Sequence, residues 1–150
     1  MKGTAMSATP TFSPQLIGQT EKTLNAILDR HLAGAALSEP QWVTLTLAAM
    51  SGEPVDRGQL VARVARAAKF SEPDVQAHVT ALADAGLLDV SGDGRASVTD
   101  AGKQLHAQIR ATNTELTERL WGDLPAEDLA TAARVLATVL ERGDAELARD

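Results

Sequence analysis

The 150-residue sequence contains no cysteine and no tyrosine, and its aromatic residues are two phenylalanines and two tryptophans. Without cysteine the protein cannot form disulfides, thiolate metal sites or a thiol-based peroxide sensor. With so few aromatic residues, the hydrophobic core has to be built mainly from Leu, Val, Ile and Ala. That composition favours helices.

Long apolar runs are also absent. No stretch approaches the roughly 20 residues that a membrane-spanning helix requires, and the first residues carry no apolar segment typical of a secretory signal. We therefore expect a cytoplasmic protein with no membrane partner.

Positive charge is in short supply, since 14 Lys and Arg face 20 Asp and Glu and the net charge is −6. This sign is unusual for a protein that binds nucleic acid. The distribution is uneven, however. The segment 56–70 carries four basic residues against Asp56 alone, whereas the segment 71–100 carries one basic residue, Arg95, among six acidic ones. The net charge therefore does not by itself exclude a DNA-binding surface.

Apolar residues recur at three- and four-residue steps, the spacing of amphipathic helices. After residues 1–11, which we expect to be disordered, this spacing predicts a first helix from about Phe12 to Leu32. The sequence SEPQ at 38–41 predicts the start of a second helix, with Ser38 as the cap and Gln41 as the partner in a capping box.

The same start chemistry occurs twice more. Asp56 is predicted to cap a third helix, and Ser71 a fourth helix that ends at Gly86. In the fourth helix the inward positions are Val75, Val79 and Leu82. Residues 53–55, between the second and third helices, are expected to form a connector.

A hairpin follows the fourth helix. Residues 87–90 are apolar and compatible with a strand, SGDG at 91–94 is a strong turn signal, and 96–98 predicts the return strand. Arg95 is expected at the hairpin tip. Thr99 then caps a helix that runs to about Trp121, and Pro125 begins a last helix expected to end near Gly143.

This order predicts a mainly α fold with a small β-hairpin. A winged helix-turn-helix DNA-binding domain covers residues 37–100, flanked by an N-terminal dimerisation helix at 12–36 and C-terminal dimerisation helices at 101–150. The apolar stripes of the flanking helices are too extensive for one winged unit to cover. Such stripes usually pack against a partner chain. The residues expected at the dimer interface are Leu16, Ile17, Trp121, Leu136, Val139 and Leu140.

The arrangement resembles the MarR family of bacterial transcriptional regulators over roughly residues 12–140. The resemblance rests on the segments LSEPQW at 37–42, AGLL at 85–88 and SVTDAG at 97–102, in this order and spacing. It implies a homodimer, a fourth helix that reads DNA, a wing, and a small-molecule pocket between the dimer helices and the DNA-binding unit.

The expected DNA contacts come from the outer face of the fourth helix, the basic cluster of the third helix, and the wing. A glutamine such as Gln76 can read adenine through two hydrogen bonds. Arg63 and Arg66, three residues apart, share one side of a helix and suit phosphates. Arg95 would enter the minor groove. The full set is Arg57, Arg63, Arg66, Lys69, Ser71, Pro73, Asp74, Gln76, Ala77, Thr80 and Arg95.

The sequence gives fewer indications of ligand, metal or catalytic sites. His31 and Trp42 are expected to approach each other if the first two helices pack, and so to line a ligand pocket. The three histidines are too dispersed for a metal triad, and neither a GxSxG elbow nor a phosphate-binding glycine loop is present. We therefore expect no metal, no cofactor and no enzymatic activity.

The sequence is best interpreted as a homodimeric, ligand-responsive repressor that reads a pseudo-palindromic operator with its fourth helix and wing. Its partners would be double-stranded DNA, a second copy of the chain and a small-molecule effector. The alternative is a winged-helix protein-interaction or ligand-binding module with weak or lost DNA binding. Ala77, Ala81 and Asp89 motivate that alternative, because they stand where many MarR proteins carry basic residues.

Overall fold

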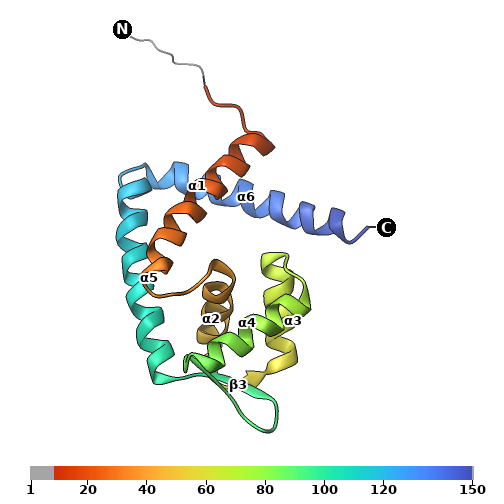
Figure 1. Cartoon of the computed structure of the whole chain (residues 1–150). Coiled ribbons are helices and arrows are strands. Elements are labelled where there is room, and N and C mark those ends of the chain that lie inside the picture. The colour runs from red at the N-terminus through yellow and green to blue at the C-terminus, as the bar shows by residue number, and fades with distance from the viewer. Residues whose placement is uncertain (1–8, 150) are drawn as a thin grey trace. The chain divides into compact units, whose positions relative to one another are not determined.

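A computed structural model describes residues 9–149, so most of the segment 1–11 that was expected to be disordered lies outside the described residues. The described part contains six helices and three short strands (Figure 1). In chain order they are α1 (Pro14–Ala33), α2 (Glu39–Ser51), β1 (Val55–Asp56), α3 (Arg57–Ala68), α4 (Glu72–Asp84), β2 (Leu88–Val90), β3 (Arg95–Val98), α5 (Asp100–Trp121) and α6 (Ala126–Leu147). The chain divides into two compact units, with the boundary between Thr112 and Asn113. The predicted mainly α fold with a winged helix-turn-helix is confirmed.

The helix starts follow the predicted capping chemistry. Ser38 Oγ accepts a hydrogen bond from the Gln41 backbone N–H at 3.3 Å, and Gln41 Oε1 accepts one from the Ser38 N–H at 3.0 Å. Asp56 and Ser71 likewise accept from backbone N–H groups in the first turns of α3 and α4. Each cap satisfies donors that a helix start otherwise leaves without a partner.

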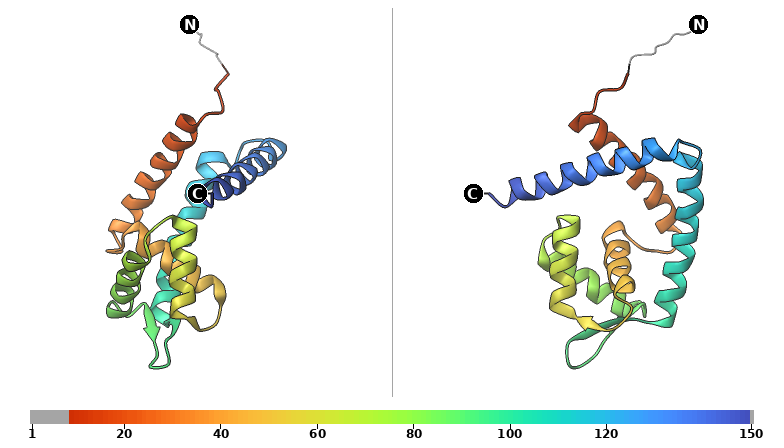
Figure 2. Two further views of the ribbon diagram at one scale, coloured as in Figure 1. Left: turned by 90° about the vertical axis from the view of Figure 1, so that its right-hand side faces the viewer. Right: turned by 180° about the vertical axis from the view of Figure 1, so that it is seen from behind.

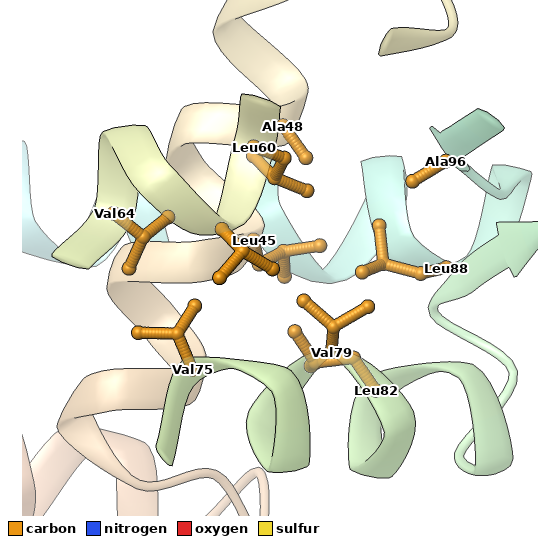
Figure 3. Close-up of a cluster of buried hydrophobic side chains, with 10 residues drawn as sticks. Leu45, Ala48, Leu60, Val64, Val75, Val79, Leu82, Leu88 and Ala96 are labelled. Carbon is orange, nitrogen blue, oxygen red and sulfur yellow. The ribbon is translucent and has the colours of Figure 1, made fainter. Parts of the chain in front are cut away.

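The core of the first unit lies between α2, α3, α4 and the sheet. In Figure 3, Val75, Val79 and Leu82 point from α4 toward Leu45 of α2 and the side chains of α3. The buried cluster is entirely aliphatic, as the scarcity of aromatic residues predicts. Its members are Leu45, Ala48, Leu60, Val61, Val64, Val75, Val79, Leu82, Leu88 and Ala96.

The sheet has three strands, which corrects the expectation of a two-stranded hairpin beside a connector. Val55 and Asp56 form β1, which pairs antiparallel with β3 so that Val55 lies opposite Ala96. On the other edge of β3, Val90 of β2 is also opposite Ala96, and the strand order is β1-β3-β2. A two-residue strand has no periodicity to detect, but it supplies the backbone partners that the outer edge of β3 needs. The β2–β3 hairpin projects beyond the helices of this unit in both views of Figure 2.

The junction between β3 and α5 is closely packed. Thr99 Oγ1 donates a hydrogen bond to the Gly86 carbonyl oxygen at 2.6 Å and accepts one from the Gly102 N–H at 3.0 Å. Gly102 is buried, and a Cβ atom at this position would overlap the carbonyl oxygen of Leu87 and lie 2.7 Å from Val98 Cγ1. The start of α5 therefore approaches the corner between α4 and β2 as closely as only glycine allows.

The second unit holds the end of α5 and all of α6. The expectation that the last helix ends near Gly143 is wrong, since α6 continues to Leu147. A single glycine lowers helix propensity without ending a helix. No residue of α6 is buried. None of the helices that the structure describes has the length and apolar character required to span a membrane.

We expect Gly102→Ala to lower the free energy of unfolding by about 2 kcal/mol, because the added methyl group cannot be accommodated without moving β2 or α5. Urea denaturation followed by circular dichroism measures the change. Gly18→Ala is the matched control, since Gly18 is also helical and a Cβ atom there meets no atom within 4 Å. Equal stabilities of the two variants would contradict the close approach at Gly102.

Candidate nucleic-acid interface

Helix α4 presents one polar face to solvent. Val75, Val79 and Leu82 are fully or almost fully buried, which fixes the rotation of the helix about its axis. The residues that the sequence placed on the outer face of α4 or at its start are all exposed. They are Ser71, Pro73, Asp74, Gln76, Ala77 and Thr80.

Arg57, at the start of α3, contacts two of those outward residues. Its Nε donates a hydrogen bond to Gln76 Oε1 at 3.0 Å, and its Nη2 donates to Thr80 Oγ1 at 2.9 Å and to the Gln76 carbonyl oxygen at 3.4 Å. The sequence prediction treated Arg57 as a phosphate contact and missed this role. Because a guanidinium can only donate, it fixes the Gln76 amide with the oxygen toward Arg57 and the NH₂ group away from it.

The backbone of Arg57 also contacts the wing. The Arg57 N–H donates to the Gly94 carbonyl oxygen at 2.8 Å, within the turn that joins β2 and β3. Gly94 has φ +84°, a conformation that favours glycine. One residue therefore connects the outer face of α4 to the turn of the hairpin.

The position of Arg95 corrects the prediction that placed it at the hairpin tip. Arg95 is the first residue of β3 and pairs with Asp56, while the turn itself is formed by residues 91–94. Its side chain is exposed. Asp93 lies in the turn, where hydrogen bonds from the Ser91 hydroxyl and from the Arg95 backbone N–H hold the pKa of the carboxyl below its usual value. The turn of the wing thus carries a negative charge next to Arg95.

The basic cluster of α3 separates into two kinds of residue. The side chains of Arg63 and Arg66 are exposed, and no ion pair of either is found within residues 9–149. Lys69 adopts a left-handed conformation at the end of α3, with φ +61°, and its Nζ donates to the Arg66 carbonyl oxygen at 2.8 Å. Lys69 therefore contributes to ending the helix, a role the sequence prediction did not include.

His31 and Trp42, which were expected to line one pocket together, line different hollows. The Trp42 ring stacks instead on His106 of α5, with 5.0 Å between ring centroids and 24° between ring planes. Trp42 is buried with Leu32 and Ile109. His31 lines a separate hollow between α1 and α5. Trp42 and His106 are far apart in the sequence, so no local signal identifies the pair.

Metal binding has no structural support in the part of the chain that the structure describes. Within residues 9–149 no group of three His, Asp or Glu side chains is placed to hold a metal ion.

Compared by sequence, the chain matches no protein-family model and no curated protein. Compared by structure, it is similar to a MarR protein from Peptoclostridium difficile, with a TM-score of 0.74, 16% identity and 97% of each chain covered. For a MarR family transcriptional regulator from Silicibacter pomeroyi the TM-score is 0.72 and the identity 23%, with 89% of this chain and 90% of that chain covered. For NadR in complex with 4-hydroxyphenylacetate the TM-score is 0.71 and the identity 22%, with 86% of this chain and 95% of that chain covered. The likeness confirms that the chain has a MarR-type winged helix-turn-helix fold.

The contacts of Arg57 predict a measurable effect on stability. Arg57→Ala removes three side-chain hydrogen bonds of a half-buried residue, so we expect the free energy of unfolding to fall by about 1 kcal/mol. Arg63→Ala makes the same change on the same helix at an exposed position. Its free energy of unfolding should stay within about 0.5 kcal/mol of the wild-type value. Chemical denaturation of both variants measures the difference, and an unaltered Arg57→Ala protein would argue against these contacts in solution.

Proposed function

We propose that this protein is a cytoplasmic, homodimeric transcriptional regulator that binds double-stranded DNA through α4 and the β2–β3 wing. The observation that carries the proposal is the MarR-type fold, in which the exposed face of α4 is joined to the wing through Arg57. A helix held in this way suits the major groove, with the wing beside it on the duplex.

Gln76 and Thr80 are the residues we assign to base recognition. Adenine is read by a side-chain amide whose oxygen accepts from N6 and whose NH₂ group donates to N7. Arg57 occupies only one of the two lone pairs of Gln76 Oε1, so the oxygen retains capacity for a base. Holding the amide in one orientation before binding lowers the entropy lost on complex formation.

Arg63, Arg66 and Arg95 are the residues we assign to the DNA backbone or minor groove. All three side chains are exposed. Cations of this kind position a protein on the duplex without reading its sequence.

Dimerisation is proposed from the surface of α6. Its apolar residues recur along one line of the helix, at Leu129, Leu136, Leu140 and Leu147, and the last three are 47%, 62% and 72% exposed. A stripe of this length left in water favours association with a second chain. Of the other residues expected at the interface, Leu16, Trp121 and Val139 are about 40% exposed and Ile17 is half-buried.

Regulation by a small molecule and repression as the output complete the proposal. The similarity to NadR, whose structure contains 4-hydroxyphenylacetate, supports a ligand-responsive protein. A ligand that prefers one spacing of the two α4 helices in the dimer would shift the population toward that spacing.

A second candidate function is a protein-interaction or ligand-binding module that lacks appreciable DNA affinity. The net charge of −6 favours it, as does the acidic character of the proposed DNA surface, where Glu72, Asp74, Asp89 and Asp93 lie on α4 and the wing. Each such carboxylate repels the phosphates that a DNA-binding face has to approach.

A DNA-binding measurement separates the two candidates. Duplexes selected from a random pool at about 50 mM salt should share two half-sites roughly one helical turn apart. Against the selected duplex, Gln76→Ala should reduce the preference at one base pair. Arg63→Ala and Arg95→Ala should each lower the slope of log K against log salt by about 0.9 per subunit, or about 1.8 for the dimer. Fluorescence anisotropy across a salt series gives both quantities.

Arg30→Ala is the control for this series, since Arg30 is an exposed arginine of α1 outside the proposed surface. It should leave both the base preference and the salt slope unchanged. Recovery of no preferred sequence from the pool would reject the DNA-binding proposal in favour of the second candidate.

The proposed dimer predicts a change of mass on substitution in α6. The wild-type chain should have the mass of two copies at micromolar concentration, and Leu136→Asp or Leu140→Asp should shift it toward one copy, because a buried unpaired charge is costly. Thr138→Asp adds the same charge on the opposite side of α6 and should remain dimeric. Sedimentation equilibrium measures the masses, and a monomeric wild type would refute the dimer.

A further inference from the structure

A hollow of about 410 Å³ lies in the first unit between α1, α2 and the C-terminal end of α3. This volume is in the range of pockets that hold small organic ligands. Among the described residues that line it, only Glu21 of α1 and Glu39 of α2 carry a charge, and both charges are negative. We call this space the acidic hollow.

The negative charge of the acidic hollow is not neutralised by a basic side chain. Within residues 9–149 no ion pair of Glu21, Asp29 or Glu39 is found. Glu39 is the first residue of α2, where the helix dipole normally favours an ionised carboxylate. Its pKa is nevertheless raised by burial, and the negative charges of Asp29 and Glu21 add to the rise. A positively charged ligand would relieve this repulsion.

An independent observation is a hydroxyl group without a partner. Thr46 of α2 lines the acidic hollow, and its Oγ1 is buried with no hydrogen-bond partner among residues 9–149. Five other threonines in helices donate to the carbonyl oxygen four residues earlier, namely Thr20, Thr23, Thr44, Thr112 and Thr138. A buried hydroxyl that lacks such a bond costs free energy, and a polar group of a ligand can supply the missing bond.

The carboxylate of α2 and this hydroxyl lie at opposite ends of an apolar surface. Glu39 and Thr46 are seven residues apart on one helix, which corresponds to two turns and about 10 Å. Between and beside them, Val43 and Leu47 form aliphatic lining. Trp42 adds an indole ring, the aromatic group that attracts cations most strongly. A ligand that matches this lining has a cationic end, an aliphatic chain and a polar far end.

A bare metal ion does not match these observations. Nowhere in the described part of the chain are three His, Asp or Glu side chains placed to hold one. A metal ion would also leave the aliphatic surface uncovered. The lining therefore suits an organic cation.

We infer that the acidic hollow binds a linear aliphatic ammonium ion with a polar group at its far end, such as an amino alcohol or a diamine. The ammonium group lies at Glu21 and Glu39, and the polar group lies at Thr46. The inference goes beyond the proposed function, because such binding requires neither DNA nor a second copy of the chain. An ammonium ion also has the opposite charge to 4-hydroxyphenylacetate, the ligand in the NadR structure, so the inference does not follow from that similarity.

Binding of an ammonium ion should be linked to ionisation of Glu39. The charged groups that act on Glu39 are Asp29 and Glu21, both on α1, whereas α3 contributes only alanines to the lining. A bound cation favours the carboxylate and lowers the pKa of Glu39. Affinity should therefore increase as the pH rises through the pKa of Glu39. An alkylammonium group, with a pKa of about 10, stays charged over this range.

The test uses the full-length chain with Trp121→Phe, which leaves Trp42 as the only tryptophan. At neutral pH, 6-aminohexan-1-ol should change Trp42 emission saturably. Calorimetric titration of the wild-type chain without DNA should give the same dissociation constant. Three compounds should bind at least about tenfold more weakly. They are 1,6-hexanediol, which lacks the charge, 6-hydroxyhexanoate, in which the charge is reversed, and ammonium chloride, which lacks the chain.

Matched variants place the charged end of the ligand. Glu21→Gln and Glu39→Gln should each weaken binding of 6-aminohexan-1-ol about tenfold, the size expected for loss of one charge-assisted hydrogen bond. Glu53→Gln removes the same charge at an exposed position outside the lining and should leave the affinity unchanged. The increase of affinity with pH should be absent from Glu39→Gln. Circular dichroism verifies that each variant is folded.

Thr46→Val places the polar end. The variant keeps nearly the same shape without the hydroxyl, so it should weaken binding of 6-aminohexan-1-ol about fivefold. Hexylamine, which has no polar group at its far end, should bind both chains equally. Because the hydroxyl has no partner in the structure, the variant should unfold at a urea concentration no lower than the wild type.

Each contrary result overturns a defined part of the inference. Equal binding of 1,6-hexanediol would show that the hollow recognises shape without charge, and equal binding of ammonium chloride would indicate an adventitious ion only. Unchanged affinity in Thr46→Val would refute the polar end. Loss of affinity in Glu53→Gln, or no heat and no emission change with 6-aminohexan-1-ol, would reject the site. None of these measurements includes DNA, so failure of the proposed DNA binding leaves them unaffected.

Discussion

Strand β3 is hydrogen-bonded along both edges, and the geometry of the winged unit depends on this double pairing. Ala96 lies opposite Val55 on one side and Val90 on the other, and its side chain is buried in the core. The end of the turn just before β3 also accepts the backbone N–H of Arg57, and the residue just after β3, Thr99, caps α5. The starts of α3 and α5 are therefore fixed relative to one strand. The contacts of Arg57 with α4 follow from that placement.

The proposed DNA surface has few cationic side chains. Arg57 is the basic residue nearest to Gln76 and Thr80, and its guanidinium is engaged in orienting them. Asp93 stays ionised in the wing turn beside Arg95, because hydrogen bonds to its carboxylate lower its pKa. The cations left for phosphates are mainly Arg63, Arg66 and Arg95 of each chain, so the affinity should fall as salt rises. Discrimination between sequences would then rest mainly on preorganised side chains of α4.

The sequence predicted those features that depend on residues close to one another in the chain. The caps at Ser38, Asp56 and Ser71, and the turn before β3, are interactions over two to four residues, and their residue types are specific. Strand β1 was missed because two residues carry no period. The contact of Arg57 with Gln76 spans 19 residues, and nothing in the spacing of charges indicates it. Long-range polar contacts are set by how the aliphatic core positions the helices, which a pattern of residue types does not specify.

Strand β3 also lies between the hollow lined by α2, β3 and α5 and the proposed DNA surface. Ser97 and Val98 of β3 line the hollow, while Arg95 at the other end of β3 belongs to the wing. A ligand that contacts both β3 and α5 favours the position of the strand in which both contacts are better. It can shift the equilibrium between two positions of β3 only by its difference in affinity for them. Gly94 directly precedes β3, so a displacement of the strand would reach Arg57 through the Gly94 carbonyl, and through Arg57 the orientation of Gln76. The hollow, strand β3 and the exposed face of α4 all lie within the first compact unit. This coupling therefore requires no movement between the two units.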